Sequence, residues 1–349
     1  MEKSNNRDFH FIALFLGFIS AVLFIYVLRE LKEIFLPFSL ALLLFFLFKN
    51  FVKWLVELKI PKPAVLILLL VFIFVLLYFF GLLVFTGAAS FAQDFPAYSG
   101  KIALIAQSVL VKFKIPLADV ERYLGHVDWQ TVLNPSRITS VISAAIGSFS
   151  SFLGHLVLIL LLLMFMLGAR SSLISRLGKS ISSRQTAGFV FVFNSIEGKV
   201  QRYLMIKTLM SLLTAVLGGI ILYLGDIDFV IFFALLIFLL NYIPTFGSLV
   251  STLFPALVGF IKFGLGWRMA LVTAGLMALQ FFMGNLVEPL ITGRRLNLSP
   301  VVILLALLFW GWLWGVIGMF LAVPITSAIK IVFEQIDSLK PLAAVMSDE

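Results

Sequence analysis

The chain is dominated by apolar runs long enough to cross a lipid bilayer, and these runs limit the folds open to it. A helix needs about 20 mostly apolar residues to cross roughly 30 Å of hydrocarbon. Such runs occupy residues 11–28, 34–48, 64–86, 152–167, 203–224 and 267–286, and another begins at 229–240. Hydrophobic residues make up 62% of the chain and charged residues 12%, unlike soluble domains. The sequence therefore predicts an all-α polytopic membrane protein of about eight membrane segments.

The formal charge of +9 follows the membrane pattern better than a nucleic-acid pattern. Lysines cluster in the loop 49–62, and Lys and Arg outnumber acids again over 170–202. Cytoplasmic loops of membrane proteins carry such an excess. The turn 225–228 holds two aspartates and no cation, so we expect it outside. The charge pattern therefore predicts a multi-pass membrane protein, with the lipid bilayer and no nucleic acid as its partner.

Changes in composition divide the chain into five parts. Residues 1–86 form the first transmembrane helices, and residues 87–150 a more polar, small helical insert on the extracytoplasmic side. Residues 151–202 hold the fourth span and amphipathic helices on the cytoplasmic face. Residues 203–333 form a C-terminal transport core, and residues 334–349 a cytoplasmic tail.

The final third is apolar but repeatedly interrupted. Breaks fall at 241–248, Pro255, 285–289, 293–300, 311–315 and Pro324. Backbone freed from a helix inside a bilayer costs several kcal/mol per polar group unless protein or a wet cavity surrounds it. Residues 244–265 and 299–322 are each either a full crossing or a re-entrant helical hairpin, and we favour hairpins, turning at Pro255 and at 311–315. Interrupted apolar segments of this kind are typical of transporter binding sites.

Glu288 is the most informative acid, because it is the only carboxylate between Asp228 and Glu334. A carboxylate in a membrane span should pair or face a cavity. Arg294 and Arg295 are the expected partners. Glu288 is then either a substrate-binding or proton-coupling residue, or half of a structural ion pair. Lys207, near the cytoplasmic end of its span, either reaches out to the lipid headgroups, which we favour, or contacts the substrate.

Polar and turn-forming residues of the broken segments make up the predicted transport site. The alternative is that the polar ones cap helix ends freed by the prolines. Another set, expected to act in helix packing or turns, is Pro255, Gly311, Gly315 and Pro324. The predicted site comprises Asn241, Tyr242, Pro244, Gly247, Ser248, Asn285, Glu288, Pro289, Arg294, Arg295, Asn297, Ser299 and Pro300.

Catalysis is not indicated by the sequence. Cysteine is absent, and the three histidines, His10, His126 and His155, fall in different predicted regions. No zinc-protease, nucleophile-elbow or nucleotide-binding motif occurs. We therefore predict no enzyme activity, no catalytic residues, no metal and no cofactor.

Three blocks of the sequence resemble the autoinducer-2 exporter family of bacterial membrane proteins. They are N-Y-I-P-T-F-G-S at 241–248, N-L-V-E-P-L-I-T-G-R-R-L-N-L-S-P at 285–300 and F-W-G-W-L-W-G-V-I-G-M-F-L-A-V-P at 309–324. The resemblance implies an inner-membrane protein with both termini cytoplasmic and an extracytoplasmic insert after the third span. It also implies a homo-oligomer, with a pentamer known in the family, and export of the quorum-sensing signal autoinducer-2.

The leading hypothesis is a secondary transporter that exports a small polar solute such as autoinducer-2. The alternative is a sodium/proton antiporter that uses Glu288. A third hypothesis is a non-transporting scaffold whose insert, 87–150, binds a partner.

Overall fold

The computed structural model describes residues 15–17, 19–20, 22–112, 153–168, 183–264, 266–292 and 298–348. Nearly all of these residues are helical, and none of them lies in a strand. Six helices in this part of the chain are long and apolar enough to cross a membrane. They are Lys32–Glu57, Lys62–Gly87, Val190–Leu224, Phe246–Phe263, Trp267–Ile291 and Pro300–Gln335. The prediction of an all-α, multi-pass membrane protein is confirmed.

The chain divides into two compact units, and neither is continuous in sequence. Unit 1 comprises residues 1–50, 158–200 and 297–349, and unit 2 comprises 51–157 and 201–296. The division falls within α2 (Lys32–Glu57), within the helix Leu153–Gly168 and within α7 (Ser183–Leu224). The predicted transport core therefore contributes to both units.

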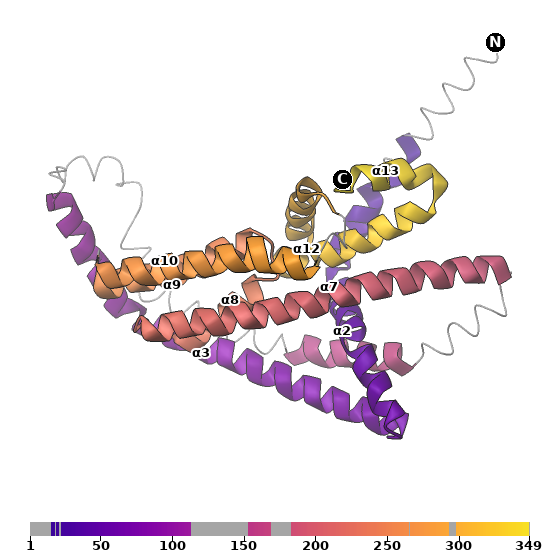
Figure 1. Ribbon diagram of the computed structural model, residues 1–349, viewed down its shortest axis with the longest axis horizontal. Coiled ribbons are helices and arrows are strands. Elements are labelled where there is room, and N and C mark those ends of the chain that lie inside the picture. The colour runs from indigo at the N-terminus through magenta and orange to yellow at the C-terminus, as the bar shows by residue number, and fades with distance from the viewer. Residues whose placement is uncertain are drawn as a thin grey trace, which may run out of the picture. The chain divides into compact units, whose positions relative to one another are not determined.

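Unit 2 is built from α3 (Lys62–Lys112), the second half of α7, and the helices that follow it. These are α8 (Val230–Leu240), α9 (Phe246–Phe263), α10 (Trp267–Phe282), η1 (Met283–Val287) and α11 (Glu288–Thr292) (Figure 1). Their shared core is apolar and consists of Ala215, Leu222, Ile227, Phe233, Ile237, Val258, Val272 and Leu276. Burial of this cluster holds α7, α8, α9 and α10 together.

The helices α8 and α9 form a helical hairpin. At its open end, Lys262 Nζ lies 2.8 Å from Asp228 Oδ1 and 2.7 Å from the Asp226 carbonyl oxygen. At its closed end, a Cβ on Gly247 would collide with the Leu240 carbonyl, so only glycine permits this approach. Thr245 takes a positive φ of 58° in the turn, which is unusual for a β-branched residue.

The position of this hairpin differs from the expectation. The sequence predicts a turn at Pro255, but α9 continues through Pro255 as one helix. The turn lies instead at residues 241–245, between α8 and α9. A proline inside a helix removes one hydrogen bond and introduces a kink, but it does not have to end the helix. Burial of Pro255 among neighbouring helices keeps the chain helical there.

The third predicted span lies within α3, which is longer than the span itself. The helix continues through residue 87 to Lys112, so the first part of the predicted insert prolongs it. Phe80 contacts Phe238 of α8 with ring centroids 5.9 Å apart. Residues 113–150 of the insert, and residues 169–182 of the predicted amphipathic segment, lie outside the described residues.

Unit 1 contains a second helical hairpin, within α12 (Pro300–Gln335). Gly315 has φ 68° and ψ −148°, values that no helix permits. Trp310 Nε1 donates to Thr326 Oγ1 at 3.2 Å, although 16 residues of continuous helix would separate them by about 24 Å. A Cβ on Gly318 would collide with the Trp310 carbonyl. The chain therefore doubles back at Gly315, within the segment where the sequence favours a hairpin.

The C-terminal tail packs against the start of this hairpin. It forms η2 (Asp337–Leu339) and α13 (Lys340–Val345), and the Ser299 backbone N–H donates to the Met346 carbonyl at 3.0 Å. Lys340 Nζ lies 2.6 Å from Asp337 Oδ1, and this contact lowers the pKa of the exposed Asp337 carboxyl. The tail is thus part of unit 1.

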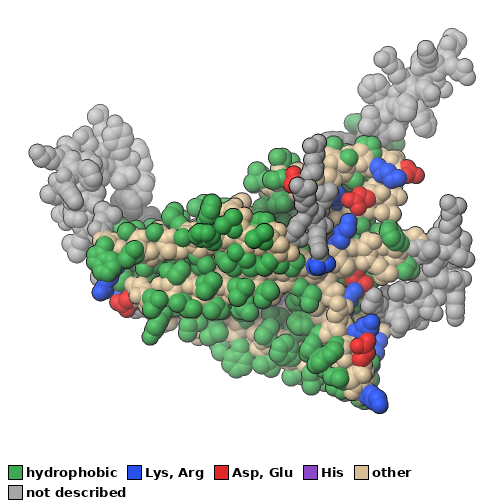
Figure 2. Space-filling model, in the orientation of Figure 1, with side chains coloured by type: hydrophobic (Ala, Val, Ile, Leu, Met, Phe, Trp, Pro, Cys, Tyr) green, Lys and Arg blue, Asp and Glu red, His purple; other side chains and the backbone are tan. Residues whose placement is uncertain are grey.

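Large apolar side chains cover the outer surface of the helices. Ile67, Leu68, Leu209, Leu271 and Met277 are all more than half exposed. Figure 2 shows hydrophobic side chains over much of the visible surface, with charged side chains gathered in a few places. Exposed apolar area of this extent is expected when lipid, not water, surrounds the helices.

Candidate functional site

Two charged side chains of opposite sign meet inside the membrane-spanning part of unit 2. Lys207 Nζ of α7 lies 2.6 Å from Glu288 Oε1 and 2.9 Å from Glu288 Oε2. The Lys207 side chain is 6% exposed and the Glu288 side chain 24% exposed. Burying either charge alone in a membrane span is unfavourable, and pairing offsets that penalty. The carboxylate is the less buried partner, so it is the one that a solute or water reaches more easily.

The contact corrects one expectation from the sequence. Lys207 does not reach toward the headgroups, because its ammonium is buried against Glu288. The partner lies 81 residues further along the chain, and no local pattern reveals it. Arg294 and Arg295, the partners expected for Glu288, lie outside the described residues.

Glu288 is positioned by an irregular helix. The π-helix η1 separates α10 from α11, and Pro289 follows Glu288 directly. Proline lacks the N–H that would bond to the carbonyl four residues earlier, that of Asn285, and its ring would collide with it. A wider π-turn relieves this collision, and such turns are frequent at functional sites. Asn285 lies in η1, is exposed, and donates from Nδ2 to the Phe281 carbonyl at 3.2 Å.

The turn of the α8–α9 hairpin is hydrogen-bonded to α7 next to Lys207. Tyr242 donates its hydroxyl to Thr208 Oγ1 at 2.7 Å, and Asn241 Nδ2 donates to Ser211 Oγ at 3.1 Å. Thr208 adjoins Lys207 in sequence, and Ser211 is one helical turn further on. Two predicted site residues, Asn241 and Tyr242, therefore contact α7, the helix that carries Lys207.

A stripe of polar residues on α7 was not predicted from the sequence. Lys207, Ser211 and Thr214 follow each other at spacings of four and three residues, so they share one helix face. All three are buried, although they lie in a segment otherwise rich in leucine and isoleucine. The spacing was visible in the sequence, and polar residues repeating on one face of a span would have indicated a protein-facing polar surface.

Ser248 and Ser299 act at helix termini. Ser248 donates its hydroxyl to the Thr245 carbonyl at 2.8 Å, within the first turn of α9. Ser299 caps α12 by accepting from the Val302 N–H at 3.3 Å, with Pro300 as the first helical residue. The Ser299 contact matches the capping alternative. Ser248 does not cap α9, because its hydroxyl donates to a carbonyl and the N-cap residue Thr245 makes no side-chain capping bond.

The remaining predicted residues are divided between the units. Pro244 and Gly247 lie at the hairpin turn of unit 2, with Asn285, Glu288 and Pro289 further along the same unit. Ser299, Pro300, Gly311, Gly315 and Pro324 belong to unit 1, whereas Asn297 lies outside the described residues. The residues that the structure brings together are therefore Asn241, Tyr242 and Glu288, with Lys207, Thr208 and Ser211 added.

Comparison with known proteins places this architecture in a family. The family model of the AI-2E family transporters matches residues 14–338, which is nearly the whole chain. The chain belongs to the AI-2E transporter family. The Lys207–Glu288 pair and both hairpins accordingly lie within the matched region of a membrane transporter.

Several bacterial relatives of this AI-2E transporter match along its length. A candidate transport protein of Haemophilus influenzae is 31% identical over 99% of this chain and 98% of its own. The AI-2 transport protein TqsA of Escherichia coli is 29% identical over 92% of this chain and 91% of its own. A candidate transport protein of Borreliella burgdorferi is 28% identical, covering 94% of this chain and 88% of its own. These names indicate a transport protein.

Proposed function

We propose that this AI-2E transporter exports a small polar solute and that the solute passes the Lys207–Glu288 pair. The pair is the observation that carries the proposal. It places two charges in a membrane-spanning region, where ionisable side chains are rare and commonly mark the path of a solute or ion. The hydrogen-bonded side chains of Thr208, Tyr242 and Asn241 lie beside it, so the surroundings of the pair are polar enough for an uncharged, hydroxyl-rich molecule.

Autoinducer-2 is the solute that we propose first. The support is the family match together with the name of the Escherichia coli relative, AI-2 transport protein TqsA. A polar solute without charge suits a site in which the Lys207 and Glu288 charges already neutralise each other. The bacterial inner membrane is the location that follows from such export.

The test measures autoinducer-2 uptake into inside-out membrane vesicles. The double substitution Lys207→Met with Glu288→Gln removes both charges and is expected to lower uptake about tenfold, equivalent to about 1.4 kcal/mol of lost interaction. The matched control is Lys53→Gln with Glu57→Gln, which removes an ion pair whose side chains are 77% and 62% exposed. Equal uptake by both variants would reject the proposed route.

A second candidate function is sodium/proton antiport through Glu288. It is favoured by the partial exposure of the Glu288 carboxylate, which gives a cation or proton access to it. Sodium-driven proton flux in proteoliposomes, abolished by Glu288→Gln, would support antiport. Autoinducer-2 uptake without any sodium dependence would support the first proposal instead.

A homo-oligomer, with a pentamer as the family resemblance implies, is a further part of the proposal. Native mass spectrometry of the detergent-solubilised protein tests it directly. A mass of one chain would exclude it.

A further inference from the structure

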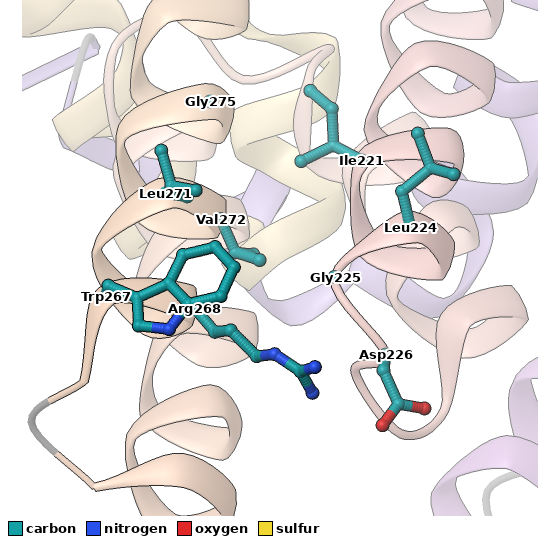
Figure 3. Close-up of a pocket in the computed structure, with 9 residues that line it drawn as sticks. All are labelled: Ile221, Leu224, Gly225, Asp226, Trp267, Arg268, Leu271, Val272 and Gly275. Carbon is teal, nitrogen blue, oxygen red and sulfur yellow. The ribbon is translucent and has the colours of Figure 1, made fainter.

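A pocket of 640 Å³ opens between the end of α7 and the start of α10, in unit 2. Figure 3 shows the residues that line it, contributed by α7, the turn that follows and α10. Its volume lies within the range of about 300–1,000 Å³ typical of small-molecule sites. The pocket is separate from the candidate transport site, because Leu224 and Lys207 are about 25 Å apart along α7.

The inner wall of the pocket is apolar. Ile221, Leu224, Leu271 and Val272 line it, with the first two on α7 and the other two on α10 (Figure 3). Leu224 is 78% exposed and Leu271 62% exposed, so the wall continues onto the surface that faces lipid. An alkyl chain entering from the bilayer would meet apolar side chains along this path.

The mouth of the pocket carries charge of both signs. Arg268 extends from α10 on one side, and Asp226 lies on the other side (Figure 3). The Arg268 guanidinium lies 5.8 Å from the Trp267 ring centroid and 5.9 Å from that of Phe263. Among the described residues, no carboxylate is within ion-pair distance of it. The guanidinium therefore has donors free for an external acceptor.

The Asp226 carboxylate is also accessible to a ligand. Its side chain is 72% exposed and lies 3.4 Å from Lys262 Nζ, whereas Asp228 Oδ1 lies closer, at 2.8 Å. Asp226, Asp228, Lys262 and Arg268 together sum to zero charge. A ligand that carries one positive and one negative group therefore matches this mouth better than an anion does.

The mouth lies where two apolar spans end, at Leu224 and Trp267. Trp267 is 70% exposed, and tryptophan is enriched at the level of the lipid headgroups. We propose that this pocket binds a phospholipid with an ethanolamine headgroup. Arg268 binds the phosphate, Asp226 accepts hydrogen bonds from the ammonium, and one acyl chain lies along Ile221, Leu271 and Val272.

The test is native mass spectrometry of the full-length protein in detergent with equal amounts of phosphatidylethanolamine and phosphatidylglycerol. The wild-type protein is expected to retain phosphatidylethanolamine in preference. Arg268→Gln should lower retention of both lipids about tenfold, the equivalent of one charge-assisted hydrogen bond. Asp226→Asn should lower only phosphatidylethanolamine, removing the preference between the two.

Two further variants test whether the lipid binds in this pocket or elsewhere on the lipid-facing surface. Leu271→Trp fills the apolar wall and should reduce retention as Arg268→Gln does. Arg202→Gln, which removes an exposed cation elsewhere on α7, should leave retention unchanged. Equal retention of the two lipids by the wild-type protein, or equal losses with Arg202→Gln and Arg268→Gln, would overturn the proposal. The test does not measure autoinducer-2 uptake, so its result is independent of whether the proposed transport function is correct.

Discussion

Lys207 and Glu288 show how single residues in this protein combine a structural and a functional demand. Each is a charge in an apolar helix, and each makes the other tolerable. The pair couples α7 to the irregular segment η1–α11, so any change in its protonation or solvation acts on both helices. A site of this kind both holds helices together and responds to a passing solute.

Removing only one partner is expected to destabilise the protein. Lys207→Met leaves the partly buried Glu288 carboxylate unpaired, which should cost about 3 kcal/mol of folding stability. Adding Glu288→Gln removes the stranded charge and should restore most of that loss. Thermal unfolding in detergent, followed for the two single variants and the double variant, measures this coupling.

A double variant as unstable as Lys207→Met would show that packing of the long lysine side chain, not its charge, stabilises unit 2. Restored stability without restored uptake would separate the structural contribution of the pair from its contribution to transport.

At the level of elements, two helical hairpins define the irregular parts of the chain. The α8–α9 hairpin turns at residues 241–245, and the α12 hairpin turns at Gly315. Each depends on a glycine at which the backbone of the other arm approaches closely, Gly247 in the first and Gly318 in the second. Small residues at such contacts let helix backbones meet, and dispersion contacts then hold them.

The first hairpin makes a prediction about Gly247. Gly247→Ala would drive a methyl group into the Leu240 carbonyl and should lower stability by about 1–3 kcal/mol, the usual effect of overpacking. Gly198→Ala on α7 is the matched control, because nothing lies within 4 Å of a Cβ there. The control should be neutral or stabilise by up to about 1 kcal/mol. Thermal unfolding of both variants is the measurement, and equal effects would contradict the close approach at the turn.

The second hairpin can be tested by cross-linking. A Cβ on Gly311 would lie 2.9 Å from Met319 Cγ, so cysteines at these two positions should form a disulfide on oxidation. The protein has no native cysteine to interfere. Cysteines replacing Gly198 and Ile206 have the same sequence separation but lie on the continuous helix α7, about 12 Å apart along its axis.

Mass spectrometry after proteolysis distinguishes the two pairs. We expect a cross-link for positions 311 and 319 and none for 198 and 206. Failure of the first pair to cross-link under conditions that oxidise exposed thiols would mean that the chain does not double back at Gly315.

At the level of the whole molecule, charge sets the orientation in the membrane. The lysine-rich loop at 49–62 and the aspartate turn at 225–228 are predicted to lie on opposite sides. In the structure, α2 ends at Glu57, within the lysine-rich segment, and α7 ends at Leu224, directly before the aspartate turn.

Single cysteines at exposed positions test this orientation. Lys53→Cys and Asp226→Cys replace side chains that are 77% and 72% exposed. A membrane-impermeant maleimide added to intact cells should label position 226 and should reach position 53 only after the membrane is broken. Labelling of position 53 in intact cells would reverse the proposed topology.

The sequence by itself determined the fold class and located the irregular segments at 241–248, 285–289 and 311–315. Both follow from local properties, since a long apolar run predicts a span and a proline or glycine within it predicts a break. It also identified Glu288 as an acid that needs a partner. The same local reasoning placed one hairpin turn at Pro255, where the helix in fact continues, since a buried proline is tolerated inside a helix. The break expected at Pro324 is absent, because α12 continues through that residue as a helix.

Only the tertiary structure decided which residues meet. Lys207 and Glu288 are 81 residues apart, and Trp310 meets Thr326 because the chain reverses between them. No single-sequence pattern encodes such pairings, because they depend on how separate helices pack. The tertiary structure therefore turned a list of isolated polar residues into an ion pair, a hydrogen-bonded hairpin turn and a lipid-facing pocket.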